Sequence, residues 1–396
     1  MPDPAVRNAV RRLGRGAAFA AKAAPWIGLG AMTGLWVRAA RRPTLANPGG
    51  TVAETPEQAD AREPGHGRQA SAPIRIPWLG WRDIVWRTWR EVSLDRLPQV
   101  AGGITVYSLL ALFPAVGAFV SLYGLFADVG PVSGQLRMLA AFVPQGFLSL
   151  VGDQMVQLAS RPPAGLSVAF LVSLLLSVWS ANAGMQSLIS GLNVAYGEVE
   201  KRRFLVLQSL SYGATFAGLI FVTAVTAVLV AVPLWLIGLG LHETWLLPFR
   251  WIVVLGLAIG AFAAVYRYGP SRQKARWRWV IPGAGIAALG WIGGSLGYSW
   301  FLNNVAHYDV TYGPLGAVVG FLMWIWVTAM IVLLGAELNA EMEHQTACDT
   351  TTGAPAPMGQ RGAVMADTLG PAFVGLHKLL DRTEERIGRF RRRGRR

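Results

Sequence analysis

The sequence predicts an all-α protein that crosses a membrane six times, with an amphipathic interfacial helix before the first span. Of its 396 residues, 53% are hydrophobic and 15% are charged, whereas soluble domains carry about 25% charged residues. The apolar residues gather in segments long enough to cross roughly 30 Å of hydrocarbon. The lysines and arginines, which give a net charge of +14, gather on alternate sides of those segments. Together these patterns indicate a polytopic membrane protein.

Residues 1–77 are predicted to be a basic, largely disordered cytoplasmic segment. The stretch 17–37 is apolar, but it holds Lys22 and Pro25 and has arginines on both sides, so either orientation of a span would put an arginine cluster outside. We therefore expect this stretch at the membrane surface, with a signal anchor as the alternative. Residues 43–77 are rich in Pro, Gly, Ala and charge and show no period, which is typical of disordered linkers.

The segment 78–96 is predicted to be an amphipathic helix in the headgroup layer. Its tryptophans and valines recur at spacings of three and four, and charged residues fill the other side. Tryptophan and arginine together favour the boundary between water and hydrocarbon. A soluble helix packed on a partner is the alternative. The apolar face holds Trp78, Trp81, Val85, Trp89 and Val92, and the polar face holds Arg82, Asp83, Arg87, Arg90 and Glu91.

The second predicted span, at about 164–196, changes character along its length. It begins as an apolar run and then carries Asn182, Gln186 and Asn193 at offsets of four and seven, which place all three amides on one helix face. Because an amide in hydrocarbon loses its hydrogen bonds, we expect the other helices to enclose this face. The other spans are predicted at about 101–127, 205–238, 247–266, 279–302 and 314–336, and 132–160 is predicted to form two short amphipathic helices that do not span.

The basic residues predict that both termini lie in the cytoplasm. Lysine and arginine concentrate before the first span, after the second and fourth spans and after the sixth, and only Arg137, Arg161 and Arg250 lie on the other side. This alternation follows the positive-inside rule. The tail 345–396, with a short helix expected around 371–388, ends in an arginine run that should attract anionic lipid headgroups. No aromatic platform accompanies the run, so nucleic acid is not an expected partner. The same lipid contact is predicted for Lys201, Arg202, Arg203, Arg276 and Arg278.

Three stretches carry specific patterns: AGGITVYSLLALFPAVGAFVSLYGLF at 101–126, VWSANAGMQSLISGLNVAYGEVEKRRF at 178–204 and YGPLGAVVGFLMWIWVTAMIVLLGAELNAEMEH at 312–344. Together they resemble the YihY/BrkB family of bacterial inner-membrane proteins, over about residues 80–345. The resemblance implies six helices with cytoplasmic ends in the inner membrane. Members have carried the labels ribonuclease BN, now generally regarded as misassigned, and virulence factor, and some are linked to movement of lipid or lipopolysaccharide precursors. No agreed substrate or catalytic residue comes with the resemblance.

No pattern in the sequence predicts an enzyme. Gly293–Gly297 match the GxSxG form, but a serine nucleophile needs a base within reach and only His307 is near in sequence. Close packing of GxxxG helices explains the same glycines. Glu341 and His344 have the Glu-x-x-His spacing of di-iron bundles, which need a second such motif and further carboxylates. We therefore expect no catalytic residue, no metal and no cofactor, and the ribonuclease label has no catalytic constellation to support it.

The remaining candidates are polar residues within the predicted spans, which could line a substrate groove. They could equally form interhelical hydrogen bonds that contribute about 0.6–2 kcal/mol each. Because this lining has no fixed charge, coupling to an ion through an embedded carboxylate is not expected. At the cytoplasmic edge we place Glu337 and Asn339, and an arginine of a cytoplasmic loop is the expected partner of Glu337. The groove candidates are Asn182, Gln186, Asn193, Tyr107, Ser108, Ser299 and Asn303.

The sequence thus favours a transport or lipid-translocation component with an amphiphilic or lipid substrate. A membrane-embedded hydrolase, either a ribonuclease or an intramembrane protease, and a non-catalytic scaffold are the alternatives. The identity of the substrate, the direction of movement, the energy source and the oligomeric state are left open.

Overall fold

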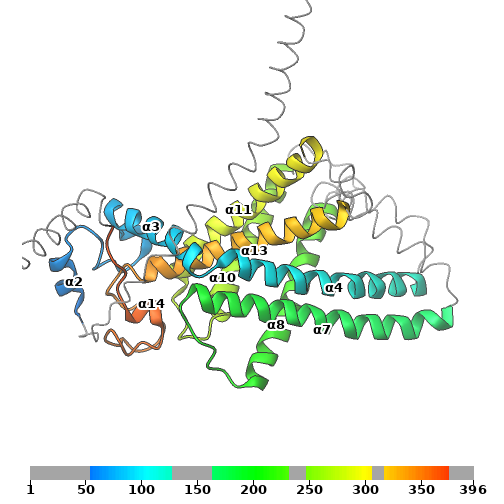
Figure 1. The fold of residues 1–396 in the computed structure, drawn as a ribbon, viewed down its shortest axis with the longest axis horizontal. Coiled ribbons are helices and arrows are strands. Elements are labelled where there is room, and N and C mark those ends of the chain that lie inside the picture. The colour runs from blue at the N-terminus through cyan, green and yellow to red at the C-terminus, as the bar shows by residue number, and fades with distance from the viewer. Residues whose placement is uncertain (1–53, 127–162, 232–246, 306–315, 374–396) are drawn as a thin grey trace, which may run out of the picture. The chain divides into compact units, whose positions relative to one another are not determined.

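The computed structural model of the protein describes residues 54–126, 163–231, 247–305 and 316–373. Within these ranges the chain is helical, and its β pairing consists of one isolated bridge between Ala275 and Thr351. The long helices are shown in Figure 1 and are α4 (Leu97–Phe126), α7 (Pro163–Ala195), α8 (Phe204–Thr226), α10 (Leu247–Tyr268), α11 (Trp277–Asn304) and α13 (Gly316–Glu343). A π-helical turn, Ala227–Ala231, extends α8.

Several of these helices are long and apolar enough to cross a membrane. In the described part of the chain there are 4 such segments, namely Phe204–Leu229, Arg250–Tyr268, Trp277–Leu302 and Val318–Glu343. The prediction of an all-α polytopic membrane protein is therefore confirmed. The count of six spans and the cytoplasmic placement of both termini stay predictions. The stretches 17–37 and 132–160 lie outside the described residues.

Where the structure describes them, most helix bounds follow the predicted ones closely, with one difference. The third predicted span reaches 238; its described part runs to Ala231, and 232–238 lie outside the described residues. The sixth predicted span ends at 336, where the apolar run stops, yet α13 continues to Glu343. The reason is packing: Ala336 and Ala340 are buried in the main hydrophobic core, so the helix is held by protein beyond its apolar stretch.

α13 is the shared neighbour of α11, α4, α3 and α7. Its core-facing residues include Val332 and Ala336, which pack with Leu192 of α7 and Tyr266 of α10. The Tyr266 hydroxyl donates a hydrogen bond to the Val332 carbonyl oxygen, 2.7 Å away. α13 thereby joins the end of α7 to α10 and α11.

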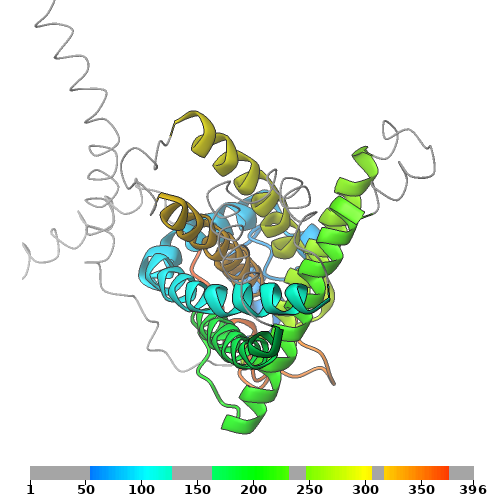
Figure 2. The ribbon, with the colours of Figure 1, turned by 90° about the vertical axis from the view of Figure 1, so that its right-hand side faces the viewer.

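α4 and α7 run side by side, as both Figure 1 and Figure 2 show. Small residues permit this contact, because a Cβ atom added to Gly184 would lie 3.6 Å from the hydroxyl of Ser108. One added to Gly191 would lie 2.8 Å from a methyl group of Val100, closer than ordinary packing allows. Close approach through small residues is the usual way in which membrane helices associate.

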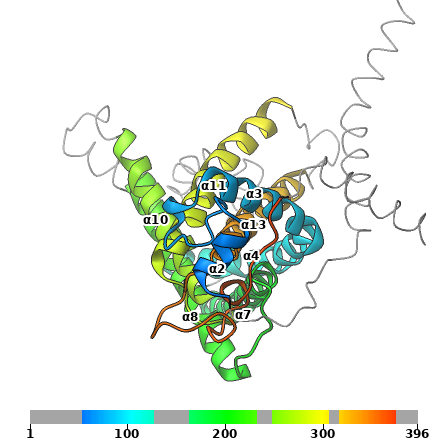
Figure 3. The same cartoon turned by 90° about the vertical axis from the view of Figure 1, so that its left-hand side faces the viewer.

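Residues 54–77 and 344–373 pack together at the end of α13 where the helix finishes, and we call this assembly the end cap (Figure 3). It includes α2 (Pro56–Arg62), a 3-10 turn (Pro73–Arg75) and α14 (Val364–Asp367). The prediction of disorder therefore does not hold for 54–77. A capping box between Thr55 and Gln58 starts α2, and the buried side chain of Arg68 ties this segment to the chain after α13. Apart from 371–373, which are not helical, the helix predicted at 371–388 lies outside the described residues.

Candidate functional site

Three amides of α7 and α8 form a cluster, which we call the amide cluster. Asn182 and Gln186 of α7 both donate to the side-chain oxygen of Gln208 in α8, at 3.0 and 2.7 Å. Asn182 is only 3% exposed, and its own amide oxygen is buried without a hydrogen-bond partner. The predicted offset of four thus brings two of the three α7 amides together. Sequence reasoning missed Gln208, although a lone glutamine in the apolar run FLVLQSL is a usable signal.

The third amide of α7 has a different role. Asn193 donates to the Glu200 carboxylate at 3.0 Å and accepts from the backbone N–H of Ser271 at 2.7 Å. It therefore ties the end of α7 to the loop before α8 and to the loop after α10. Asn193 belongs to the framework and has no contact with the amide cluster among these hydrogen bonds.

The other groove candidates are distributed over α4 and α11. Ser108 lies at the α4–α7 contact, beside Gly184 of α7. Gly184 follows Asn182 by two residues, which is about half a helical turn. Tyr107 is exposed. Ser299 of α11 is half-buried, and the side chain of Asn303 lies outside the described part of the chain. These positions do not establish a continuous groove, which stays a prediction.

Several predicted lipid-contacting cations are held by the protein. Arg202 donates to the Glu200 carboxylate at 2.7 and 2.8 Å and to the Gly269 carbonyl oxygen at 2.7 Å. These hydrogen bonds from Arg202, against the opposing effect of burial, lower the pKa of Glu200 to about 2. Arg276 donates to the Thr351 carbonyl oxygen at 2.8 Å. Lys201 is paired with Glu198 at 2.8 Å but keeps an exposed side chain, and Arg203 and Arg278 are exposed. Lipid contact stays a prediction for all five cations.

α3 (Trp78–Leu94) turns its charged face toward the protein. Asp83 and Arg87 are 0% and 1% exposed, whereas Trp78 and Trp89 on the apolar face are 78% and 68% exposed. The helix is as predicted, but two charged residues of its polar face are buried and most of its apolar face is outward, the reverse of a helix that packs on a soluble domain. The outward face carries an open pocket of about 430 Å³ lined by Trp78, Trp81, Arg82, Val85 and Trp86. Placement in the headgroup layer suits such a face and stays a prediction.

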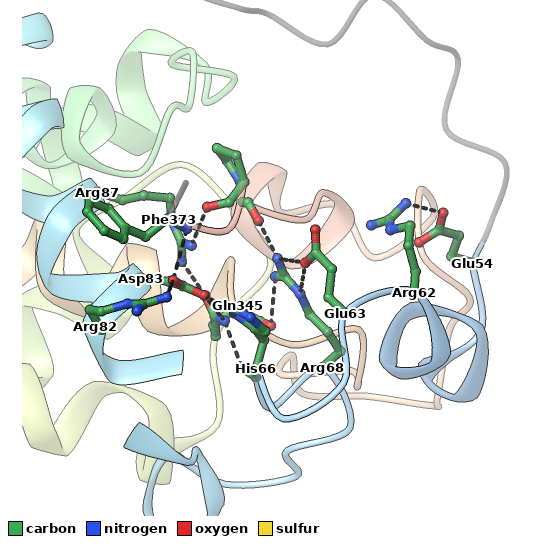
Figure 4. Close-up of polar contacts among 12 residues, drawn as sticks. Glu54, Arg62, Glu63, His66, Arg68, Arg82, Asp83, Arg87, Gln345 and Phe373 are labelled. Carbon is green, nitrogen blue, oxygen red and sulfur yellow. Dashed lines mark hydrogen bonds and ion pairs between the residues drawn. The ribbon is translucent and has the colours of Figure 1, made fainter. Parts of the chain in front are cut away.

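Figure 4 shows the buried polar network that joins α3 to the end cap. Arg87 is paired with the Glu341 carboxylate and donates to the Gln345 side chain at 2.6 Å and to the Pro371 carbonyl oxygen at 3.0 Å. The carboxylate of Asp83 accepts from the backbone N–H of Phe373 at 2.9 Å. Every charge that α3 buries thus has partners, as buried charges require.

The cap is held by a second buried arginine in the same network. Arg68 donates to the carbonyl oxygens of Gln345 at 3.1 Å and Gly370 at 2.6 Å, and to the Glu63 carboxylate at 2.9 Å. The sequence predicts both arginines as parts of water-facing or disordered segments. They are instead the connections between chain segments that lie far apart in sequence.

Asn339, predicted at the cytoplasmic edge, joins α13 to α11 through hydrogen bonds of its side chain. Its side-chain N–H donates to the Val280 carbonyl oxygen at 3.0 Å, and its oxygen accepts from the Gly283 backbone N–H at 2.9 Å. α11 contains Pro282, which lacks a backbone N–H and disturbs the helix's own hydrogen bonds. The amide of Asn339 therefore bonds to backbone groups on either side of this proline.

Glu337 does not have the arginine partner that we predicted. The arginine pairs form farther along α13, where Arg87 contacts Glu341 and Arg272 contacts Glu343 at 2.7 Å. Glu337 is 0% exposed, and neither of its carboxylate oxygens has a hydrogen-bond partner. It lies within the candidate span Val318–Glu343, beyond position 336 where the sixth predicted span ends.

The side chains of the enzyme-like patterns make structural contacts between or within helices. Ser295 of the GxSxG match accepts a hydrogen bond from the indole N–H of Trp324 at 3.2 Å, between α11 and α13. His344 lies 3.6 Å from Glu341, which is already paired with Arg87. In the ranges that the structure describes, no group of three or more His, Cys, Asp or Glu residues could hold a metal ion.

Comparison with known proteins gives one family and a set of distant relatives. The family model described as virulence factor BrkB matches residues 88–359. A protein named as ribonuclease-like, YfkH of Bacillus subtilis, is 29% identical over 252 residues, which cover 60% of this chain and 86% of the relative. A UPF0761 membrane protein of Methylibium petroleiphilum is 28% identical over 67% of this chain and 62% of its own length. One of Photobacterium profundum is 26% identical over 67% of this chain and 82% of its own length. No solved structure matches.

Proposed function

The chain belongs to the family described as virulence factor BrkB, and from this premise we propose that it moves an amphiphilic lipid across a bacterial inner membrane. The observation that carries the proposal is the amide cluster of Asn182, Gln186 and Gln208. It is a partly buried polar cluster between two apolar helices, and the amide oxygen of its buried member, Asn182, has no partner. A polar site among membrane helices has a cost, and such sites commonly serve a substrate pathway.

The depth of the amide cluster suits a lipid headgroup. Gln208 lies four residues after Phe204, where α8 and its apolar segment begin. With a rise of about 1.5 Å per residue, Gln208 is about 6 Å inside the segment. That depth corresponds to the boundary between headgroups and acyl chains, on the side where Lys201 and Arg203 can attract an anionic lipid.

The surroundings of the amide cluster suit an acyl chain. Leu175 and Trp179 of α7 and Phe204 and Leu205 of α8 have exposed side chains. Apolar side chains exposed on membrane helices face hydrocarbon. A lipid could therefore present hydrogen-bond donors of its headgroup to Asn182 while its tails stay against these apolar surfaces, which is the arrangement that lipid movement requires.

The two other candidate functions have less support. The ribonuclease-like name belongs to a relative that is 29% identical, and Ser295 and Glu341 are engaged by Trp324 and Arg87. We propose that the chain is not an enzyme. A scaffold would have no need for a vacant acceptor such as the amide oxygen of Asn182 between its helices.

Replacing Gln208 with leucine is expected to slow lipid movement about tenfold, since losing a hydrogen-bonding group worth about 1.4 kcal/mol changes a rate by that factor. The double change Asn182→Leu with Gln186→Leu should have at least the same effect. The measurement uses proteoliposomes with a lipid that is fluorescently labelled on its headgroup. A membrane-impermeant reductant quenches the outer leaflet, and further quenching reports movement.

The matched control for this experiment is Thr223→Val on the same helix. Its hydroxyl donates to Leu219 of its own helix at 2.8 Å and is exposed, so its loss should leave the rate unchanged. Equal rates for the wild-type protein and Gln208→Leu would contradict the proposal. So would a wild-type rate no higher than that of vesicles without protein.

A further inference from the structure

Glu337 is a buried carboxyl group that the proposed lipid movement does not use. It is fully buried, both oxygens lack a hydrogen-bond partner, and it lies in the helix that contacts α3, α4, α7 and α11. Its protein environment supplies no donor, although burying an ionised carboxylate normally requires one or more. A neutral carboxyl group without hydrogen bonds costs far less free energy than an unpaired carboxylate, so burial without a donor indicates that Glu337 carries a proton.

The positive charges packed on α13 belong to other carboxylates. Arg87 from α3 is paired with Glu341, one turn beyond Glu337, and is also bonded to Gln345. Arg272, from the loop after α10, holds Glu343 with two hydrogen bonds at 3.0 and 2.7 Å. Neither guanidinium group has Glu337 among its hydrogen-bond or ion-pair partners.

The charged groups that interact electrostatically with Glu337 are acidic. Glu91 and Asp95 come from α3 and its end, and Glu341 comes from the same helix. Tyr196, which follows α7, also interacts electrostatically with Glu337, and its side chain is fully buried. Among the described groups that interact electrostatically with Glu337 there is thus no cation that would pair with its carboxylate.

We propose that Glu337 is a proton-binding site of this protein, and that it exchanges its proton with water through Asp95. Asp95 suits the role of an intermediate because it is only half-buried and ends α3 next to the exposed residue Arg96. Because neither Glu337 oxygen has a hydrogen-bond partner in the protein, the transfer runs through an intervening water. A proton taken up by the Asp95 carboxylate passes by way of this water to the Glu337 carboxylate, leaving Asp95 ionised, and the reverse transfer returns it to bulk water. No oxidant, metal or lipid takes part, so the site does not depend on the proposed lipid movement.

The electrostatics of Asp95 support this assignment. Burial, followed by the charges of Glu91 and Glu341, raises the pKa of Asp95 to about 7. An unfolded aspartate has a pKa of about 3.9, so the folded protein binds the proton more tightly than the unfolded chain. The resulting stabilisation is fully present below the unfolded value and is lost as pH rises toward 7. Near neutral pH, Asp95 can therefore both accept and release a proton.

The test is infrared spectroscopy of the full chain in lipid nanodiscs, which detects the carbonyl stretch of a protonated carboxyl group. The wild-type protein should show this band at neutral pH, and Glu337→Gln should remove most of it. Asp95→Asn should leave the Glu337 band in place and slow its exchange of hydrogen for deuterium at least several-fold. The matched control, Glu57→Gln on the exposed part of α2, should leave the spectrum unchanged. Absence of the band in the wild-type protein, or its persistence in Glu337→Gln, would overturn the proposal.

Thermal unfolding gives an independent readout. An amide has nearly the shape of a protonated carboxyl group, so Glu337→Gln should unfold at the same temperature as the wild-type protein or a higher one. Glu341→Gln, which takes the charge from the partner of Arg87, should unfold at a lower temperature. A Glu337→Gln protein that fails to fold, or that loses as much stability as Glu341→Gln, would show that the ionised form is needed and would also overturn the proposal.

Discussion

Replacing Arg87 with leucine is expected to lower the free energy of unfolding by about 3–5 kcal/mol, the usual cost of breaking a buried ion pair from one side. The change leaves the carboxylate of Glu341 buried without its cation and removes donors to Gln345 and Pro371. The end cap should open first, because Arg87 connects α3 to the chain after α13. Denaturant unfolding in mixed micelles measures the loss, and limited proteolysis after residue 344 should report the opening.

A double variant distinguishes the cost of leaving one charge of the Arg87–Glu341 pair unpaired from the cost of losing the whole pair. Arg87→Met combined with Glu341→Leu removes both charges, and replacing a buried pair with apolar groups is often neutral or stabilising. We expect it to recover much of the stability that Arg87→Leu loses. The exposed Arg82→Leu change on the same helix should cost less than about 1 kcal/mol. If Arg87→Leu and Arg82→Leu lost similar amounts, the buried network would not be what holds the cap.

Replacing Gly283 with alanine is expected to destabilise the protein by about 3 kcal/mol, the upper end of the usual cost of overpacking. A Cβ atom at this position would overlap the Gly335 carbonyl oxygen and the side-chain oxygen of Asn339. Because one of these atoms is backbone, α11 and α13 must move apart. That movement would also break the hydrogen bonds of Asn339 with Val280 and Gly283.

Gly285→Ala is the matched control for this prediction. It lies on the same helix two residues away, and a Cβ atom there would meet no atom within 4 Å. Because alanine favours a helix over glycine by about 1 kcal/mol, this change should leave stability unchanged or raise it. Thermal unfolding of the two variants side by side measures the difference. Equal effects would mean that the α11–α13 contact is looser than described.

The sequence predicts the helices well because their apolar runs and breakers are local properties. The amides of the second predicted span show how much of the site such local patterns can predict. The offset between Asn182 and Gln186 places both on one face, and the structure buries Asn182 there. Their common acceptor, Gln208, depends on which helix packs beside α7, and no periodicity within a single helix contains that information.

The faces of α3 show a second limit. The three- and four-residue spacing separates Trp78 and Trp89 from Asp83 and Arg87 correctly, but period alone does not say which face is buried. In lipid the apolar face can point outward while buried charges are paired inside the protein. The pairing requires Glu341, which lies 254 positions away in the chain.

Composition misleads at residues 54–77 and at Glu337. Proline, glycine and charge suggest a linker, although the T-P-E-Q sequence at 55–58 contains the capping box that starts α2. At Glu337 the charge suggests the end of a span. Tertiary packing instead buries it without a partner, an outcome that no local rule predicts.

Native mass spectrometry of the protein released from membranes tests most directly whether the amide cluster holds a lipid headgroup. The wild-type protein and Thr223→Val should each retain the same polar-headgroup lipid, and Gln208→Leu should lose it while remaining folded. Identical lipid adducts on all three proteins would contradict this account.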